Sequence, residues 1–149
     1  MTNSAQMTNK DMLQFWFDEV WTKGNYDAIE QMFKPDAEAN GLFPAFGLST
    51  ADYRDLALAI RHLISDLQVI FSHALEQDDW LAVRTVIKAN RADTLEPIEV
   101  TGQVFVRFEE NRIAEIYSHL DFFSLFEKLG QLPRDALAIC LTGEGLQWK

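Results

Sequence analysis

The segment IYSHLD, from Ile116 to Asp121, carries three polar side chains at alternate positions. If the segment is an extended strand, Tyr117, His119 and Asp121 share one of its faces, because successive side chains point to opposite faces. A carboxylate among aromatic side chains has a raised pKa, which suits it to accept and return a proton near neutral pH. A histidine two positions away could share that proton or orient a carbonyl group. The pattern therefore predicts acid–base chemistry on a carbonyl or ring compound, without a cofactor.

A structural role explains Asp121 equally well. The apolar run FFSLFEKLG follows it and predicts a helix from about Phe122 to Lys128. An aspartate just before a helix accepts hydrogen bonds from the free amides of the first turn. Alternation does not decide which face of the strand points inward. Ile113 and Ile116 are both typical core residues, but they are three positions apart and so lie on opposite faces of a regular strand. Either both faces are covered, or a β-bulge shifts the register between the two isoleucines.

His73 is the second histidine that could reach such a site. It alternates with Val69, Phe71 and Leu75 in a predicted strand and is expected to approach from a neighbouring wall. For both His73 and His119, a hydrogen-bonded wall or surface position is the alternative, and it is the more common role of a histidine in such a strand. The histidines show no HxH or HxxxH spacing, and one cysteine cannot form a thiolate zinc site, so we expect no metal.

The elements that must position these residues are segregated along the chain. Periodicity and capping residues predict helices at Lys10–Lys23, Asp27–Phe33 and Ala51–Ser65, with Asn9 and Ser49 or Thr50 as N-caps. Alternating segments then predict antiparallel strands at 68–77, 80–90, 98–110 and 112–121. Such an order is typical of an α+β domain with helices on one face of a curved sheet. We expect one domain over residues 1–149, with a loose tail at about 1–8. Residues 131–149 are expected to pack on this domain or on a partner.

Composition excludes several classes of function. The formal charge of −10 repels phosphate backbones and anionic lipid, so neither nucleic acid nor a membrane surface is an expected partner. The first residues lack the pattern of a signal peptide, and no apolar stretch is long enough to span a bilayer. The single cysteine, Cys140, fits a reducing compartment. These features predict a soluble, cytoplasmic protein.

Three segments together resemble a known family: FWFDEVWTKGNYDAIEQMF, QDDWLAVRTVI, and VTGQVFVRFEENRIAEIYSHLD followed by LFEKLG. From Lys10 to Gly130 the chain is similar to the SnoaL-like polyketide cyclases, within the nuclear transport factor 2-like superfamily. The resemblance implies a cone-shaped, cystatin-like fold, with long helices packed into the concave side of a strongly bent sheet and a pocket open at one end. Proteins of this shape include ketosteroid isomerase, scytalone dehydratase and epoxide hydrolases, and members that only bind or dimerise.

The resemblance also suggests site residues. In the family an aromatic residue on the last strand is followed four positions later by a catalytic aspartate, and Tyr117 and Asp121 match that spacing, with tyrosine in place of the usual tryptophan. Residues 89–91, AlaAsnArg, depart from the glycine, threonine and histidine of the family's second strand. The resemblance favours the Tyr117 face as the inward one. The expected catalytic residues are Asp121, His119 and His73, and the expected pocket residues are Tyr117, Trp16, Phe43, Phe46, Tyr53 and Val104.

Two functions are consistent with this pattern. The leading hypothesis is an enzyme that acts by proton transfer on a small apolar or ring-containing molecule, with Asp121 as general acid and base. The alternative is a module that binds a hydrophobic ligand or dimerises, in which Asp121 only caps the helix. Trp80, Val86 and Phe105 would lie on the outer face of the sheet, and such an apolar patch predicts a homodimer.

Overall fold

The computed structural model describes residues 7–40 and 49–147, so the predicted pocket residues Phe43 and Phe46 lie outside the described part. Within these residues, three helical segments come first, followed by one strand and one helix, then four successive strands and two short helices. The helices are α1 (Asn9–Trp16), η1 (Phe17–Thr22), α2 (Asp27–Met32), α3 (Thr50–Arg61), α4 (Phe122–Lys128) and α5 (Ala136–Leu141). The strands are β1 (Phe33–Asn40), β2 (Ile64–Gln77), β3 (Trp80–Arg91), β4 (Pro97–Glu109) and β5 (Arg112–Leu120).

The first predicted helix is divided into two parts. Thr8, rather than Asn9, caps it, since the Thr8 hydroxyl accepts a hydrogen bond from the Asp11 amide at 3.1 Å. After Trp16 the chain widens into η1, a π-helix, whose backbone hydrogen bonds span one residue more than those of an α-helix. Both parts turn apolar side chains inward, and the buried residues are Met12, Leu13, Trp16, Phe17, Val20 and Trp21.

Helix α3 begins as predicted and ends earlier. The Ser49 hydroxyl accepts a hydrogen bond from the Asp52 amide at 3.1 Å, which confirms the predicted N-cap. The helix stops at Arg61 instead of Ser65, because Ile64 pairs with Arg91 and starts β2. The apolar spacing around Ile64 is compatible with a helix, but pairing with β3 provides the hydrogen bonds that the backbone N–H and C=O groups need there.

The sheet has five strands in the order β1-β5-β4-β3-β2. The predicted antiparallel meander is confirmed for β2 to β5. Strand β1 was not predicted, because it follows α2 directly and contains Pro35, which cannot donate a ladder hydrogen bond. It pairs parallel with β5 at the edge of the sheet, where a proline is tolerated.

The inward or outward direction of the predicted site residues depends on two β-bulges, one in β5 and one in β2. In β5, Ile113 pairs with Phe108 and Glu115 pairs with Arg107, so Ala114 is an extra residue. This bulge lets both Ile113 and Ile116 be buried, which resolves the alternative that the sequence left open. In β2, Phe71 pairs with Thr85 and His73 with Arg84, so Ser72 is the extra residue. Beyond each bulge the two faces of the strand exchange.

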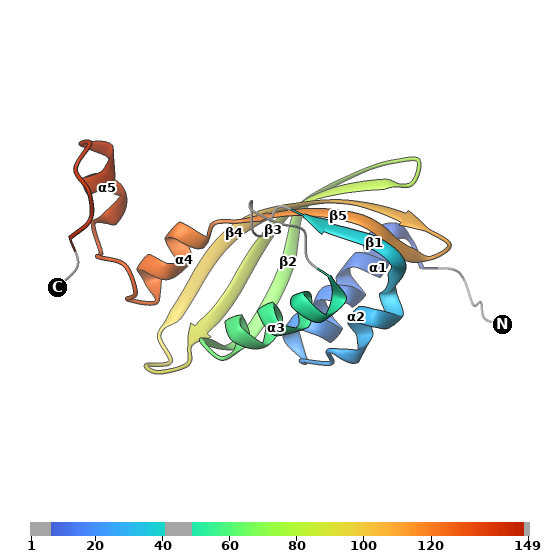
Figure 1. Cartoon of the computed structure of the whole chain (residues 1–149), viewed down its shortest axis with the longest axis horizontal. Coiled ribbons are helices and arrows are strands. Elements are labelled where there is room, and N and C mark those ends of the chain that lie inside the picture. The colour runs from blue at the N-terminus through green and yellow to red at the C-terminus, as the bar shows by residue number, and fades with distance from the viewer. Residues whose placement is uncertain (1–6, 41–48, 148–149) are drawn as a thin grey trace.

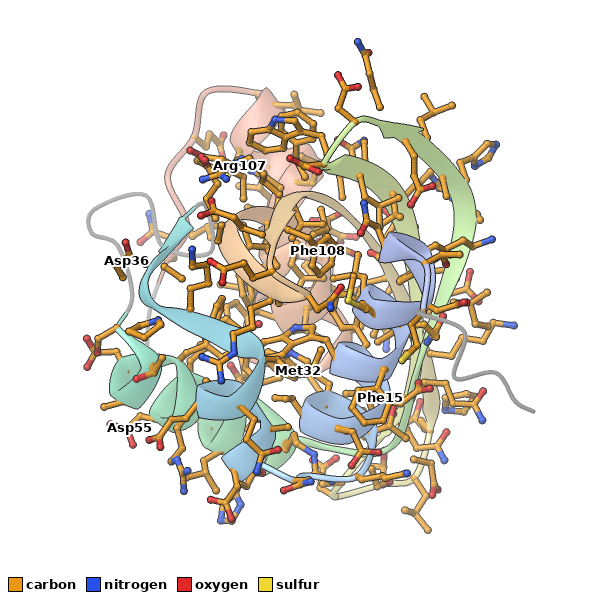
Figure 2. All side chains as sticks on the ribbon, turned by 90° about the vertical axis from the view of Figure 1, so that its right-hand side faces the viewer. Phe15, Met32, Asp36, Asp55, Arg107 and Phe108 are labelled. Atoms are coloured by element: carbon orange, nitrogen blue, oxygen red, sulfur yellow. The ribbon has the colours of Figure 1, made fainter. Side chains whose placement is uncertain are left out.

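The core lies between the sheet and the first helices. Helices α1, α2 and α3 cover one face of the sheet, while α4 lies at the end of β5 and α5 extends beyond α4 (Figure 1). Viewed from the side, Phe108 lies in the interior, and Arg107, its neighbour in β4, lies outside (Figure 2). Figure 2 also shows Phe15 and Asp55 on the outward sides of their helices. The fold is therefore a mixed α+β domain with a curved open sheet, as the sequence predicts.

Helix α5, near the C-terminus, is only partly buried. Ala136 of α5 is buried, but Leu137 and Leu141 are 56% and 78% exposed. Within residues 7–40 and 49–147, no helix is both long enough and apolar enough to cross a membrane.

Candidate ligand cavity

A cavity of about 70 Å³ lies between the helices and the inner face of the sheet. A buried water needs roughly 10–15 Å³, so the cavity has room for about five waters, which is the bulk of one six-membered ring. Its wall is mainly apolar. The helices contribute Phe17, Trp21, Tyr53, Ile60 and Leu125, and the sheet contributes Ile64, Leu67, Val69, Thr85, Ile87, Ala89, Ile98, Val100, Val104, Ser118, His119 and Leu120.

Two hydroxyl groups interrupt the apolar sheet wall. Thr85 in β3 and Ser118 in β5 are 2% and 9% exposed, and both line the cavity. No hydrogen-bond partner for either side chain is found among the described residues. Because buried polar groups are normally hydrogen-bonded, these hydroxyls are available to a polar atom of a ligand.

Gly102 in β4 keeps the space between these strands open. It pairs with Thr85 on one side and with Leu120 on the other. A Cβ atom at this position would lie 2.7 Å from the His119 carbonyl oxygen and 3.0 Å from the Thr85 hydroxyl oxygen. A side chain is therefore excluded here by contact with both neighbouring strands.

The helical wall contributes a third hydroxyl. Trp21 donates its indole N–H to the Tyr53 hydroxyl oxygen at 3.1 Å, and both residues line the cavity. Burial raises the pKa of the Tyr53 hydroxyl, so the group stays protonated throughout the physiological range. Val104 also lines the cavity, as the sequence predicts. Trp16 packs against Tyr53, with ring centroids 5.3 Å apart, but it does not belong to the described wall.

Asp121 caps helix α4. One of its carboxylate oxygens accepts a hydrogen bond from the Ser124 amide at 3.0 Å. The residue is exposed and borders a hollow on the outer side of the sheet, together with Arg84, Gly102 and His119. The predicted helix cap is therefore present, and the carboxylate does not belong to the described cavity wall.

The predicted inward face of β5 is wrong. Because of the bulge at Ala114, Ile116 and Ser118 point inward, and Tyr117 lies on the outer face against Phe105, with ring centroids 6.5 Å apart. The Tyr117 hydroxyl donates a hydrogen bond to Glu115 at 2.7 Å. His119 is exposed and borders both the cavity and the outer hollow that contains Asp121.

The predicted position of His73 is wrong for the same reason. The bulge at Ser72 turns His73 away from the face that carries Val69 and Phe71, and its Nδ1 lies 3.0 Å from the Ser72 hydroxyl oxygen. His73 instead forms an outer row across four strands, His73, Arg84, Gln103 and His119, in which each residue pairs with the next. The three proposed catalytic residues thus lie at the rim or on the outer face.

Comparison with known proteins identifies the family. The model of the SnoaL-like polyketide cyclases matches residues 11–129 of the chain. The chain belongs to this family. A search of curated proteins finds no match.

Solved structures show the same fold as this SnoaL-like chain. One is a candidate polyketide cyclase from Acidithiobacillus ferrooxidans, with 20% identity, a TM-score of 0.69, and coverage of 87% of this chain and 99% of that one. Another is IdmH, a candidate polyketide cyclase from Streptomyces antibioticus, with 16% identity, a TM-score of 0.71, and coverage of 83% and 99%. A protein of ketosteroid isomerase-like fold from Catenulispora acidiphila, in complex with trimethylamine, has 16% identity, a TM-score of 0.69, and coverage of 86% and 98%.

Family membership and fold together indicate a small-molecule cyclase or isomerase type of domain. Thr85, Ser118 and Trp21, which contribute polar groups at the cavity wall, were not predicted from the sequence. A signal for Thr85 was present, since it alternates with the apolar residues Leu81, Val83 and Ile87 in one strand. Ser118 had no such signal, because its direction depends on the bulge. In the described part of the chain, no group of three or more histidine, cysteine or acidic side chains is arranged to hold a metal ion.

Proposed function

We propose that the chain binds a small, mostly apolar, ring-containing molecule in the inner cavity. The observation that carries this proposal is an apolar cavity whose wall includes the buried hydroxyls of Thr85 and Ser118. Apolar walls favour burial of a ring, and a few convergent polar groups fix its orientation. The family, whose members include candidate polyketide cyclases, supports the same class of ligand.

A pair of variants on strand β3 tests this proposal. Ala89 lines the cavity, whereas Ala82 lies on the outer face of the same strand. Ala89→Leu should fill part of the cavity and weaken binding of cyclohexanone at least tenfold, while Ala82→Leu should leave it unchanged. Binding can be followed by NMR through the indole N–H signal of Trp21. Equal affinity in both variants, or no binding to the wild type, would rule out the inner cavity as the ligand site.

Acid–base catalysis is a second proposed function, with Asp121 as the proton carrier. The supporting observation is that His119 borders both the cavity and the outer hollow that contains Asp121. A ketone at the cavity mouth would present its α-carbon toward this rim, where Asp121 would remove and return a proton and His119 would orient the carbonyl. His73 lies farther along the same outer row and is proposed only to shape the rim.

Proton exchange at the α-carbon of cyclohexanone in heavy water provides the assay. The wild type should accelerate exchange above the buffer rate, and Asp121→Asn, which keeps a capping side chain, should abolish the acceleration. If the wild type does not accelerate exchange, or if Asp121→Asn exchanges at the same rate as the wild type, Asp121 does not act as the base.

We also propose that the outer face of the sheet packs against a second copy of the chain. Trp80 stacks on Phe105 with ring centroids 4.5 Å apart, Phe105 is 47% exposed and neighbouring Leu75 is 77% exposed. Exposed apolar patches of this kind usually mark an interface. The wild type should have the mass of a dimer at micromolar concentration and Phe105→Ser that of a monomer. A monomeric wild type would contradict the proposal.

A further inference from the structure

Helix α5 (Ala136–Leu141) leaves most of its apolar side chains exposed. Its sequence, ALAICL, contains only apolar residues and one cysteine. Ala136 is buried, but Leu137 and Leu141 are 56% and 78% exposed. An isolated helix shorter than about 12 residues is marginal in water and depends on packing, so α5 has apolar surface to offer to a partner. It lies beyond residues 11–129, which the family model matches, and the family fold does not account for it.

The outer groove is a hollow of about 520 Å³ on the outer face of the sheet. Leu75 of β2, Ala82 of β3 and Phe105 of β4 form its apolar part, and Ala82 pairs with both of the others. Leu75 is 77% exposed and Phe105 is 47% exposed, so this part of the groove is open to a partner. Its volume and apolar wall suit side chains of the size of leucine.

The outer groove carries basic side chains next to its apolar part. Arg84, His73 and His119 line it, and none of its described lining residues is acidic. Arg84 donates a hydrogen bond from Nη1 to the Ser72 hydroxyl at 3.0 Å, and within residues 7–40 and 49–147 it forms no ion pair. Asp121 lines the adjoining hollow rather than the groove. The groove therefore favours an apolar partner that carries negative charge.

The segment around α5 has that charge and lies where a second copy could present it. Residues 135–147 include two acidic residues, Asp135 and Glu144, and no basic residue. In Figure 1, α1–α3 lie below the sheet, whereas α5 lies at the upper left, on the side that these helices leave uncovered. The hairpin between β2 and β3, which carries Leu75 and Ala82, rises at the opposite end. A half-turn of one copy against another thus brings each α5 toward the other copy's groove.

We propose that α5 of one copy packs into the outer groove of a second copy, with Leu137 and Leu141 against Leu75 and Phe105. The acidic residues that flank α5 then lie near Arg84, and the opposite charges attract. Because each copy contributes one helix and one groove, a single two-fold axis forms both contacts. This inference rests on the proposed packing of two copies through the outer face, and it names the segment that the groove holds.

A matched pair of leucine substitutions tests the role of α5. Leu141→Lys removes an apolar contact and adds the charge that the groove already carries, so the dissociation constant of the dimer should rise at least about tenfold. Leu95→Lys is the control, because Leu95 is 66% exposed between β3 and β4 and belongs neither to α5 nor to the described groove wall. Its dimer should dissociate as the wild type does. Sedimentation velocity over a dilution series measures all three proteins.

A cross-link tests where α5 lies. Cys140 of α5 is exposed, and Ala82→Cys/Cys140→Ser would carry its single thiol in the groove. This variant and the wild type are diluted together, concentrated so that subunits exchange, and treated with the thiol cross-linker bismaleimidoethane. The product should be dimer-sized and should join position 82 to Cys140, as peptide mass spectrometry would show. Ala92→Cys/Cys140→Ser, with its thiol between β3 and β4, is the control and should give no link to Cys140.

The outcomes separate this inference from the packing on which it rests. A monomeric wild type contradicts both. A dimeric wild type whose mixture gives no link between position 82 and Cys140 leaves the outer-face packing in place and refutes the role of α5. A Leu141→Lys variant that dimerises as well as the wild type refutes it too. A link within one chain of Ala82→Cys, which retains Cys140, would place α5 on its own groove and overturn the contact between copies.

Discussion

Replacement of Asp121 by alanine should destabilise the protein through helix α4 alone. The carboxylate satisfies the Ser124 amide at 3.0 Å, and removal of an N-cap acceptor typically costs about 1 kcal/mol of the free energy of unfolding. For a chain of this length, 1 kcal/mol lowers the melting temperature by about 2–4 °C. Helix α4 carries Leu125, which lines the cavity, so cap loss should also weaken ligand binding slightly.

The control for this prediction is Asp121→Asn, since asparagine caps helices about as well as aspartate. Urea unfolding followed by circular dichroism, at one fixed protein concentration, should place Asp121→Asn within a few tenths of a kcal/mol of the wild type. Equal destabilisation by both substitutions would show that the charge, and not the cap, stabilises the fold. A fully stable Asp121→Ala would refute the role of the cap altogether.

Two further predictions concern the sheet. Gly102→Ala should lower the free energy of unfolding by about 1–3 kcal/mol, because the new Cβ would lie 2.7 Å from a backbone oxygen of His119, whereas Gly145→Ala, in open space, should be neutral in the same urea titration. A neutral Gly102→Ala would contradict the tight packing of β4. The Tyr117 hydroxyl, with Arg107, holds the pKa of the Glu115 carboxyl below its ordinary value of 4.5. The resulting stability is present above that ordinary value and is lost as the pH falls through the lowered pKa of the folded state. Acid titration of Tyr117→Phe should therefore show a shallower loss of stability than the wild type, and identical acid curves would argue against the contact.

The features that sequence predicted correctly depend on neighbouring residues in the chain. The caps at Ser49 and Asp121 follow from a polar side chain three positions before an amide that needs an acceptor. The meander follows from alternation and from the turn at Glu110 and Asn111, which both have positive φ. These local rules gave the α+β class and most of the strand order.

The features that sequence missed depend on pairing between distant segments. No local signal marks Ala114 as the extra residue of β5, because the bulge exists only in relation to its partner strand. That single residue decides whether Tyr117 or Ser118 faces the cavity. Strand β1 was missed because its hydrogen bonds come from β5, far away in sequence, and because Pro35 argues against a central strand.

The bulges at Ser72 and Ala114 have a consequence for how such a domain can diversify. Beyond each bulge, loss of one residue would exchange the inner and outer side chains for the rest of the strand, while the backbone hydrogen bonds could re-form. At Ala114, this exchange would turn Tyr117 and His119 inward in place of Ile116 and Ser118, of which Ser118 lines the cavity. A deletion of one codon could thus replace the Ser118 hydroxyl with aromatic and imidazole side chains in one mutational step. Alignments of relatives that ignore bulges would compare side chains on opposite faces of the sheet.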